Sequence, residues 1–418
     1  MHDDASPPLS HPALSRRRLL ASAASGAMAA WAGPLLAREV DLRLPGKPAL
    51  RPLTSEFPQK GEMILQRTRP PLLETPLSVF DTSVITPNDR FYVRWHWSQI
   101  PETIDVASYR LAVHGHVERP LSLTLASLMR DFEAIEYVAV NQCSGNSRGL
   151  FQPSVPGAQW AHGAMGNARW TGVRLKDVLA KAGIKPGAVD VRFAGLDEPL
   201  VADAPKFRKS LAVDHASDGE VMIAYAMNGE GLPLLNGFPL RLIVPGWYST
   251  YWVKMLSDIE ILPAKDDNFW MAKAYQVPDT PWGHVEPGTA DYPKVPISRM
   301  VPRALFTNLA DGQRVAPGSS VAVAGIAMGG DCGVAKVEVS TDGGAHWAAA
   351  TLGEDLGAYS FRRFTAKVTA LAAAGPMAVL CRCTNTKGVA QPMRMNWNPG
   401  GYMRGGVETV TLTVGDAA

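Results

Sequence analysis

One cysteine stands where a strand is expected to end and a polar loop to begin. The apolar run Tyr137–Val140 has the length and branching of a buried strand. It leads into the turn-forming stretch 141–149, NQCSGNSRG, which contains Cys143 and Arg148. A cation and backbone N–H groups near a thiol favour the thiolate, which is the form that binds metals. Cys143 is therefore a candidate metal ligand, and the alternative is a core cysteine at a strand end.

Arg94 and His96 form a second polar pair, inside the aromatic run Phe91–Trp97. This run alternates as a strand does, and residues two apart on a strand share one face. We therefore expect both side chains to face a polar feature that lies amid aromatic rings. A pair that simply faces solvent is the alternative.

Two other patterns suggest chemistry less clearly. His114 and His116 have a spacing found in zinc sites, but no carboxylate or cysteine pattern accompanies them, so surface or core histidines are favoured. Besides Cys143, the chain has Cys332, Cys381 and Cys383, which are too few for a disulfide scaffold. Cys332 could pair with either of the others, or all three could be unpaired buried thiols. No Cys-x-x-Cys-His is present, so no haem of the c type is attached to this chain.

The overall composition is that of a globular protein. A chain of 418 residues suggests two or three domains. Hydrophobic residues make up 46% and charged residues 19%, which argues against disorder. The net charge of +2 gives no case for binding nucleic acid.

The first 37 residues resemble a twin-arginine export signal. Arg16-Arg17-Arg18 precedes a weakly apolar segment that runs to about Ala37. That segment is short for a membrane span, which needs about 20 residues. We expect cleavage near residue 32 or 37; an uncleaved anchor is the alternative. No second apolar run is long enough to span a membrane. This export route carries folded proteins, so it indicates a cofactor acquired before export and a periplasmic location.

The remaining patterns predict an α+β chain. Residues 38–90 are rich in Pro and Leu and read as extended segments around the main domain. Helices are expected near 123–129 and 175–182, and Trp270–Pro293 is a long aromatic loop of a kind that is often functional. From about residue 300, short alternating runs separated by turns predict an Ig-like sandwich. The predicted division is an export signal at 1–37, a catalytic domain at 38–299 and the sandwich at 300–418.

Four motifs in order carry a resemblance to a known family. They are Arg94-x-His96, CSGNSR at 143–148, NARWTGVRL at 167–175, and GFPLRLIVPG at 237–246 followed by Val253-Lys254. With the sandwich, they resemble the sulfite oxidase family of molybdenum enzymes over about residues 80–415. The export signal and the lack of a fused haem domain resemble the periplasmic sulfite dehydrogenases of bacteria. The fold implied is a mixed, sulfite-oxidase-type molybdopterin-binding domain followed by the all-β sandwich.

The resemblance implies a molybdopterin cofactor whose molybdenum is bound by Cys143. By the same likeness, the pterin and its phosphate would be held by Asn146, Asn236, Arg241, Ser249 and Lys254. The chain departs from the vertebrate pattern, which has His at the position of Asn236 and Arg at that of Tyr251.

The resemblance also implies a sulfite site. Sulfite is a small anion, and arginine suits such anions better than lysine does. The implied catalytic residues are Tyr275, Arg94, His96 and Arg148. The implied substrate-binding residues are Arg94, Arg148, Trp160 and Arg404. Arg404 lies in a motif that is spaced more widely than the family's Trp-Asn-x-Arg.

The implied reaction is oxidation of sulfite to sulfate by oxygen-atom transfer, with electrons passed to a c-type cytochrome. That cytochrome could be a transient acceptor or a permanent subunit, so either a heterodimer or a homodimer is expected. One alternative is an exported reductase of methionine sulfoxide or another oxide, which the sandwich and the arginines disfavour. Others are a thiosulfate-pathway subunit with a different sulfur substrate, and a periplasmic Ig-like binding protein in which Cys143 is inert.

Overall fold

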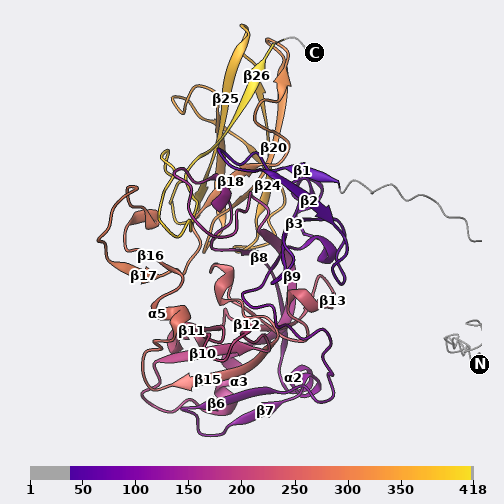
Figure 1. Cartoon of the computed structure of the whole chain (residues 1–418), viewed down its shortest axis with the longest axis vertical. Helices are drawn as coiled ribbons and strands as arrows, with labels where there is room; N and C mark the ends of the chain where they lie inside the picture. Colours follow the sequence, from indigo (N-terminus) through magenta and orange to yellow (C-terminus); the bar gives the residue numbers. More distant parts are fainter. Residues whose placement is uncertain (1–37, 416–418) are drawn as a thin grey trace, which may run out of the picture. The chain divides into compact units, whose positions relative to one another are not determined.

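A computed structural model describes residues 38–415, which belong to one compact unit. The predicted export signal and its cleavage sites lie outside the described residues. Strands dominate, and the helices are short (Figure 1). The predicted α+β class is confirmed. Within 38–415, no helix is both long and apolar enough to cross a membrane.

The N-terminal segment forms an antiparallel sheet of five strands in sequential order. Its strands are β1 (Glu39–Asp41), β2 (Leu50–Thr54), β3 (Met63–Arg67), β4 (Leu72–Glu74) and β5 (Val93–Arg94). Helix α1 (Val79–Thr82) and the 3-10 turn Asn88–Arg90 separate β4 from β5. The extended segments expected for 38–90 thus include the strands of a sheet, which the sequence analysis did not predict. Strands of two to five residues are too short to show a period of two, so the pattern could not reveal them.

Two further sheets make the middle of the chain. One has the order β11-β10-β15-β6-β7, and the other has the order β13-β12-β9-β8, with β14 paired to β12. The strands are β6 (Leu111–Gly115), β7 (Leu121–Leu123), β8 (Ala134–Gln142), β9 (Met165–Arg174), β10 (Asp190–Gly195), β11 (Arg208–Ala212), β12 (Met222–Met227), β13 (Glu230–Gly231), β14 (Arg241–Ile243) and β15 (Leu256–Leu262).

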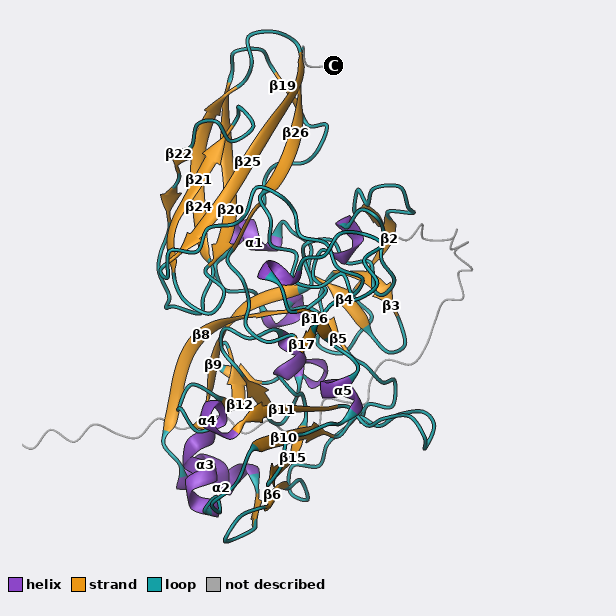
Figure 2. Ribbon diagram, turned by 90° about the vertical axis from the view of Figure 1, so that its left-hand side faces the viewer, coloured by secondary structure: helices purple, strands orange, loops and turns teal. Residues whose placement is uncertain are grey.

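Three helices cover these middle sheets: α2 (Leu125–Asp131), α3 (Leu175–Ala182) and α4 (Val213–Ala216). Thr124 caps α2 through a reciprocal pair of hydrogen bonds with Ser127, as expected for a capping threonine. Helix α3 packs against β6 and α4 against β10 (Figure 2). Helix α3 ends at Gly183, whose φ of 71° suits glycine. The helices near 123–129 and 175–182 are thereby confirmed.

The long loop after residue 269 has local structure of its own. It contains α5 (Phe269–Ala272), the strands β16 (Gln276–Pro278) and β17 (Lys294–Pro296), which pair antiparallel, and the turn Pro281–Gly283. Tyr275 lies between α5 and β16 at a φ of 57°. That backbone conformation is uncommon outside glycine and often marks functional sites. Further 3-10 turns lie at Arg148–Leu150, Leu234–Asn236 and Ser249–Tyr251.

The C-terminal region consists of two sheets around a shared core. Their orders are β18-β20-β24-β23 and β19-β26-β25-β21-β22. The strands are β18 (Arg303–Phe306), β19 (Arg314–Val315), β20 (Ser320–Met328), β21 (Val334–Ser340), β22 (Ala348–Ala349), β23 (Thr351–Leu352), β24 (Arg362–Thr369), β25 (Gly375–Asn385) and β26 (Glu408–Val414). A β-rich C-terminal region is confirmed, whereas its Ig-like character and the boundary at 299/300 stay predictions.

Cysteines of the C-terminal region are unpaired. Cys381 and Cys383 both point into its core and are fully buried, as their spacing on one strand predicts. They and Cys332 are free thiols, so of the two alternatives the structure shows the unpaired one. Burial raises the pKa of the Cys383 thiol to about 12, which makes it chemically inert at neutral pH.

Candidate active site

Cys143 lies directly after β8, at the start of a loop held by backbone hydrogen bonds. Its N–H donates to Ala164 O at 2.9 Å, and its carbonyl accepts from Asn146 N–H at 2.9 Å. The thiol is free and its residue is buried, with 6% of its surface exposed. Because the pairing of β8 with β9 ends at Gln142 and Met165, the chain turns immediately and presents Cys143 to a cavity.

Arg148 is folded back toward Cys143 in the same loop. Its Nε donates to Gly400 O at 3.0 Å, and its guanidinium lies 5.0 Å from the ring centroid of Tyr402. Two glycines make room for it: a Cβ at Gly145 would collide with the guanidinium, and one at Gly157 would lie 2.9 Å from Nη1. The loop is thus built around a buried arginine that has few partners of its own.

Arg94, His96 and Tyr275 converge on the same cavity from two distant segments. His96 Nε2 and the Tyr275 hydroxyl are 2.6 Å apart, and His96 stacks on Phe207 with ring centroids 3.7 Å apart. Burial and the neighbouring cations, Arg94 first, lower the pKa of His96 well below its usual value. Burial raises the pKa of Tyr275. A neutral imidazole therefore accepts a hydrogen bond from the hydroxyl of a neutral tyrosine.

A cavity of about 730 Å³ opens at Cys143. Its polar lining includes four arginines, and none of the residues described there is acidic. Trp160 lies in its wall, as expected from the resemblance. The lining that matters for charge and shape is Arg51, Gln66, Arg67, Arg94, Cys143, Arg148, Gln159, Trp160, Tyr275 and Tyr402. A cavity so cationic is suited to an anion.

A second, narrower cavity lies on the other side of Cys143. Arg94, Cys143 and Tyr275 line both cavities, and the narrow one adds Arg241, Ser249 and Lys254. Burial lowers the pKa of Arg241 to about 10. Burial and then Arg241 lower the pKa of Lys254 to about 7, against the opposing effect of Asp197.

The buried cations of the narrow cavity have mostly neutral partners. Arg241 donates to Asn236 O at 3.0 Å and to Asn141 Oδ1 at 3.1 Å. Lys254 Nζ lies 4.3 Å from the ring centroid of Trp95. None of the described residues that line this cavity is a carboxylate. Buried charges normally have a counter-charge, so this pair fits a phosphate-bearing ligand.

Unpartnered buried polar atoms test whether a molybdopterin cofactor fits here. Arg94 Nη1, Asn146 Nδ2 and Arg241 Nε are buried donors without a hydrogen-bond partner. Ser144 Oγ and Thr250 Oγ1 are also without one. Buried polar groups in native proteins are almost always satisfied. A ligand rich in acceptors satisfies this set, and a thiolate such as that of Cys143 suits a soft metal. The residues present therefore fit the cofactor.

Two predicted cofactor contacts are placed differently by the structure. Asn236 uses its own amide within the protein: Oδ1 accepts from Lys60 Nζ at 2.5 Å, and Nδ2 donates to Tyr92 O at 3.0 Å. It does not line the narrow cavity. Its carbonyl instead holds Arg241. Asn146 accepts from Ala164 N–H at 3.0 Å through Oδ1, while its Nδ2 is the unpartnered donor.

The predicted substrate contact at Arg404 stays a prediction, since the structure places this side chain elsewhere. Arg404 does not line the cavity at Cys143. Its Nε and Nη2 each donate to the carboxylate of Glu408 at 3.1 Å, and Nη1 donates to Leu150 O at 3.2 Å. The spacing of four residues brings this carboxylate to Arg404, and the resulting ion pair holds the guanidinium away from the cavity.

Five of the lining residues named above were missed by the sequence analysis, namely Arg51, Gln66, Arg67, Gln159 and Tyr402. Arg51, Gln66 and Arg67 lie on short N-terminal strands that show no periodicity. Tyr402 stacks on Tyr275, with ring centroids 5.6 Å apart. The guanidinium of Arg148 lies over the ring of Tyr402. The only available signal was the sequence Gly400-Gly401-Tyr402, a tight turn that carries an aromatic side chain.

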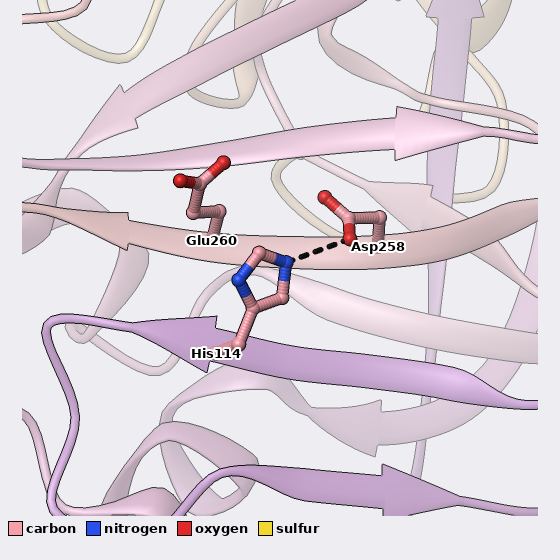
Figure 3. Close-up of side chains that lie close together, drawn as sticks. All are labelled: His114, Asp258 and Glu260. Carbon is pink, nitrogen blue, oxygen red and sulfur yellow. Dashed lines mark hydrogen bonds and ion pairs between the residues drawn. The ribbon is translucent and has the colours of Figure 1, made fainter.

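His114 makes an ion pair away from this site. Its Nε2 lies 2.8 Å from Asp258 Oδ2, and Glu260 is nearby (Figure 3). His114 lies on β6, and the two carboxylates lie on the neighbouring parallel strand β15. Glu260 is also paired with Arg192. His116 bonds to Pro186 O at 2.8 Å. Both histidines are half-buried and bonded to the protein. The two carboxylates that gather at His114 come from a distant segment, so the sequence pattern did not show them.

Comparisons with known proteins identify the family. Residues 97–270 match the oxidoreductase molybdopterin binding domain, and 296–411 match the Mo-co oxidoreductase dimerisation domain. Sulfite oxidase of Arabidopsis thaliana is 30% identical over 75% of this chain and 82% of its own length. The mitochondrial sulfite oxidase of Homo sapiens is 33% identical over 78% of this chain, which spans 60% of the human protein.

A solved structure agrees with the domain matches. The sulfane dehydrogenase SoxCD of Paracoccus pantotrophus matches with a TM-score of 0.69 and 25% identity, over 83% of this chain and 87% of that one. The chain belongs to the sulfite oxidase family of molybdopterin-binding oxidoreductases. Its predicted fold, a sulfite-oxidase-type domain followed by a β-rich domain, is confirmed.

Proposed function

We propose that this protein is a periplasmic sulfite dehydrogenase that oxidises sulfite to sulfate and passes the electrons to a c-type cytochrome. The observation that carries the proposal is the cavity at Cys143, which is lined by four arginines and by no acidic residue among those described. A neutral sulfoxide needs no such charge, so the geometry favours an anion over the substrate of a sulfoxide reductase. Membership of an oxidoreductase family weighs against a cofactor-free binding protein.

The free volume of the narrow cavity is about 20 Å³, so we propose that the donors around it contact the cofactor at its edge. Cys143 would bind its molybdenum, Arg241 and Lys254 would hold its phosphate, and Asn146 and Ser249 would contact the pterin. When bound, the cofactor supplies the oxygen atom that sulfur receives and accepts the electrons that sulfur gives up.

The protein's own side chains bind and orient the anion. Arg94 and Arg148 donate charge-assisted hydrogen bonds to sulfite, and Trp160 and Tyr402 shield it from bulk water, which strengthens those bonds. The Tyr275 hydroxyl and His96 Nε2 lie 2.6 Å apart, so the imidazole would hold the tyrosine in place. The neutral Tyr275 hydroxyl is then positioned at the cavity as a hydrogen-bonding group for the substrate.

A second candidate is another reduced sulfur compound. The cavity of about 730 Å³ exceeds the needs of sulfite, and the solved structure that matches this fold is described as a sulfane dehydrogenase. The twin-arginine motif at residues 16–18 supports a periplasmic location. The match to a dimerisation domain supports a homodimer, and a heterodimer with the proposed cytochrome acceptor remains part of the proposal.

The decisive assay is sulfite-dependent reduction of cytochrome c by cofactor-loaded protein. We expect turnover that Cys143→Ala abolishes while the circular dichroism spectrum is unchanged. As a matched control, Cys332→Ala changes a buried thiol far from the cavity and should retain turnover. Turnover of thiosulfate but not of sulfite would favour the second candidate, and equal activity of Cys143→Ala and the original protein would contradict the proposal.

A further inference from the structure

The outer half of the large cavity is built by the N-terminal sheet. Arg51, Gln66 and Arg67 line it together with Arg94 and Arg148. These outer residues precede the segment 97–270 that matches the molybdopterin-binding domain. The chain therefore adds cations to the cavity from a region outside the matched catalytic domain.

Strand register explains how Arg67 comes to lie beside Arg94. Leu72 of β4 pairs with Arg94 of β5 on one side and with Arg67 of β3 on the other. Residues paired across strands point to the same face of a sheet. Arg67 and Arg94 are thus separated by two strand spacings, about 10 Å along the sheet.

A β-bulge brings Gln66 to the same cavity. The register between β3 and β4 shifts between Leu65 and Arg67, which makes Gln66 the additional residue. Adjacent residues on a regular strand point to opposite faces, whereas a bulge re-aims a side chain. Gln66 and Arg67 can consequently both line the cavity.

Gln66 links Arg51 to a buried carboxylate behind the cavity wall. Arg51 Nε donates to Gln66 Oε1 at 3.2 Å, and Gln66 Nε2 donates to Glu74 Oε2 at 2.7 Å. Glu74 also accepts from the backbone N–H of Ala161 and Gly163 at 3.2 and 2.8 Å. These contacts fix Arg51 to the loop that carries Trp160.

The outer arginines have no carboxylate partner within ion-pair distance. Arg51 also donates to Pro48 O and Leu50 O at 3.1 and 2.8 Å, and Arg67 Nε donates weakly to Pro70 O at 3.4 Å. All of these acceptors are neutral. Burial, and then the proximity of Arg94, lower the pKa of Arg67. The charge of Arg51 acts on the Glu74 carboxyl behind Gln66, and Arg67 is exposed, so the outer pair is cationic and has no direct ion pair among the described residues.

We propose that Arg51 and Arg67 form an outer anion subsite, so that the cavity recognises a sulfur compound with a second negatively charged group at its far end. The oxidisable sulfur lies between Arg94 and Arg148, and the second anionic group lies between Arg51 and Arg67. The identity of the substrate as a sulfur compound rests on the proposed function. The existence of the outer subsite does not, because it is measured by anion binding alone.

Two probes of equal length test the subsite by calorimetry on cofactor-loaded protein. 6-Sulfohexanoate carries a sulfonate and a carboxylate, whereas hexanesulfonate carries the sulfonate alone. We expect 6-sulfohexanoate to bind about tenfold more tightly, which corresponds to one charge-assisted contact. Arg67→Gln and Arg51→Gln should each reduce that ratio toward one. Arg69→Gln, an exposed arginine that does not line the cavity, should preserve it.

Equal affinity for the two probes in the unsubstituted protein would overturn the subsite. So would variants at Arg51 and Arg67 that alter only the KM for cytochrome c, because the outer pair would then be a protein-docking patch. Binding is measured without turnover, so the two proposals can fail separately. If 6-sulfohexanoate binds tenfold more tightly than hexanesulfonate but sulfite is not oxidised, the proposed function fails and the subsite stands. If sulfite is oxidised but the two probes bind equally well, the subsite fails and the proposed function stands.

Discussion

Two pairs of arginines near the Cys143 loop have opposite surroundings. Arg303 and Arg404 share the carboxylate of Glu408, at 2.8 Å from Arg303 Nη2 and 3.1 Å from Arg404. Arg94 and Arg148 line a cavity in which no described residue is acidic. One pair is neutralised by the fold, and the other is left for a ligand.

The difference shows that the presence of a carboxylate beside the guanidinium, rather than the sequence motif around the arginine, decides whether the side chain can bind a ligand. Arg303 donates to Ser147 Oγ at 2.7 Å, and Arg404 donates to Leu150 O at 3.2 Å. The compensated pair thus holds the loop that carries Arg148. The uncompensated pair lines the cavity in which we propose that the substrate binds.

Removing the shared carboxylate should have the largest effect. Glu408→Gln leaves two buried guanidinium groups without a counter-charge, so we expect a loss of about 3–5 kcal/mol in the free energy of unfolding. Urea denaturation measures it. Asp355→Asn removes an exposed partner of Arg362 and serves as the control, with an expected loss below about 1 kcal/mol. A Glu408→Gln variant as stable as the control would abolish the distinction between the pairs.

Removing an uncompensated arginine should affect binding and spare stability. Arg148→Gln loses a charged hydrogen-bond donor to the substrate, so the KM for sulfite should rise about 10- to 100-fold. Its melting temperature should not fall, because no carboxylate is left unpaired. Arg404→Gln should show the reverse, with a lower melting temperature and a smaller change in KM. If Arg404→Gln raised the KM more than Arg148→Gln did, Arg404 would belong to the substrate site after all.

Acid should weaken the compensated cluster. Arg404, Arg303 and His162 together hold the pKa of Glu408 well below its usual value despite burial. Burial lowers the pKa of His162 to about 4. Both groups bind fewer protons in the folded state, so stability falls as pH drops: from about 6.5 to 4 through His162 and below about 4.5 through Glu408. Unfolding curves across pH 7 to 4 measure this, and His162→Asn should flatten the upper part. If the unfolding free energy of the His162→Asn variant fell with pH as steeply as that of the unsubstituted protein, His162 would not be a source of the acid sensitivity.

Ionic strength should affect the two arginine pairs differently, with a smaller effect than the substitutions above. Charges in an open cavity are screened by ions, whereas a buried ion pair is screened much less. Raising ionic strength with chloride should therefore raise the KM for sulfite several-fold while the unfolding free energy changes little. A KM independent of salt would argue against recognition by charge.

Much of the catalytic region could be predicted from the sequence. The loop 141–149 and helix 175–182 have strong local signals, and the order of motifs points to Cys143, Arg94, Arg148 and Tyr275. The cavity brings these together. Local pattern suffices for the loop and the helix because turn residues and helical periodicity act over a few positions, whereas the roles of Arg94, Arg148 and Tyr275 were implied by the resemblance to the family.

The remainder depends on contacts between distant segments. Arg404 looks like a substrate ligand until Glu408 is seen beside it. Asn236 looks like a cofactor ligand until Lys60, far away in the chain, is seen to occupy its amide oxygen. Arg51 and Arg67 lie on strands of five residues, and their approach to Arg94 follows from strand register and a bulge. No local pattern reports such pairings.

The most direct test adds sulfite anaerobically to the purified protein, without an electron acceptor, and follows its visible absorption beside a metal analysis. The uncompensated cations and unpartnered donors around Cys143 lead us to expect about one molybdenum per chain, as one cofactor site requires. Sulfite should then bleach the oxidised spectrum in the mixing time. Protein made in a host with intact cofactor synthesis that contained no molybdenum, or a molybdenum spectrum indifferent to sulfite, would contradict the proposed function.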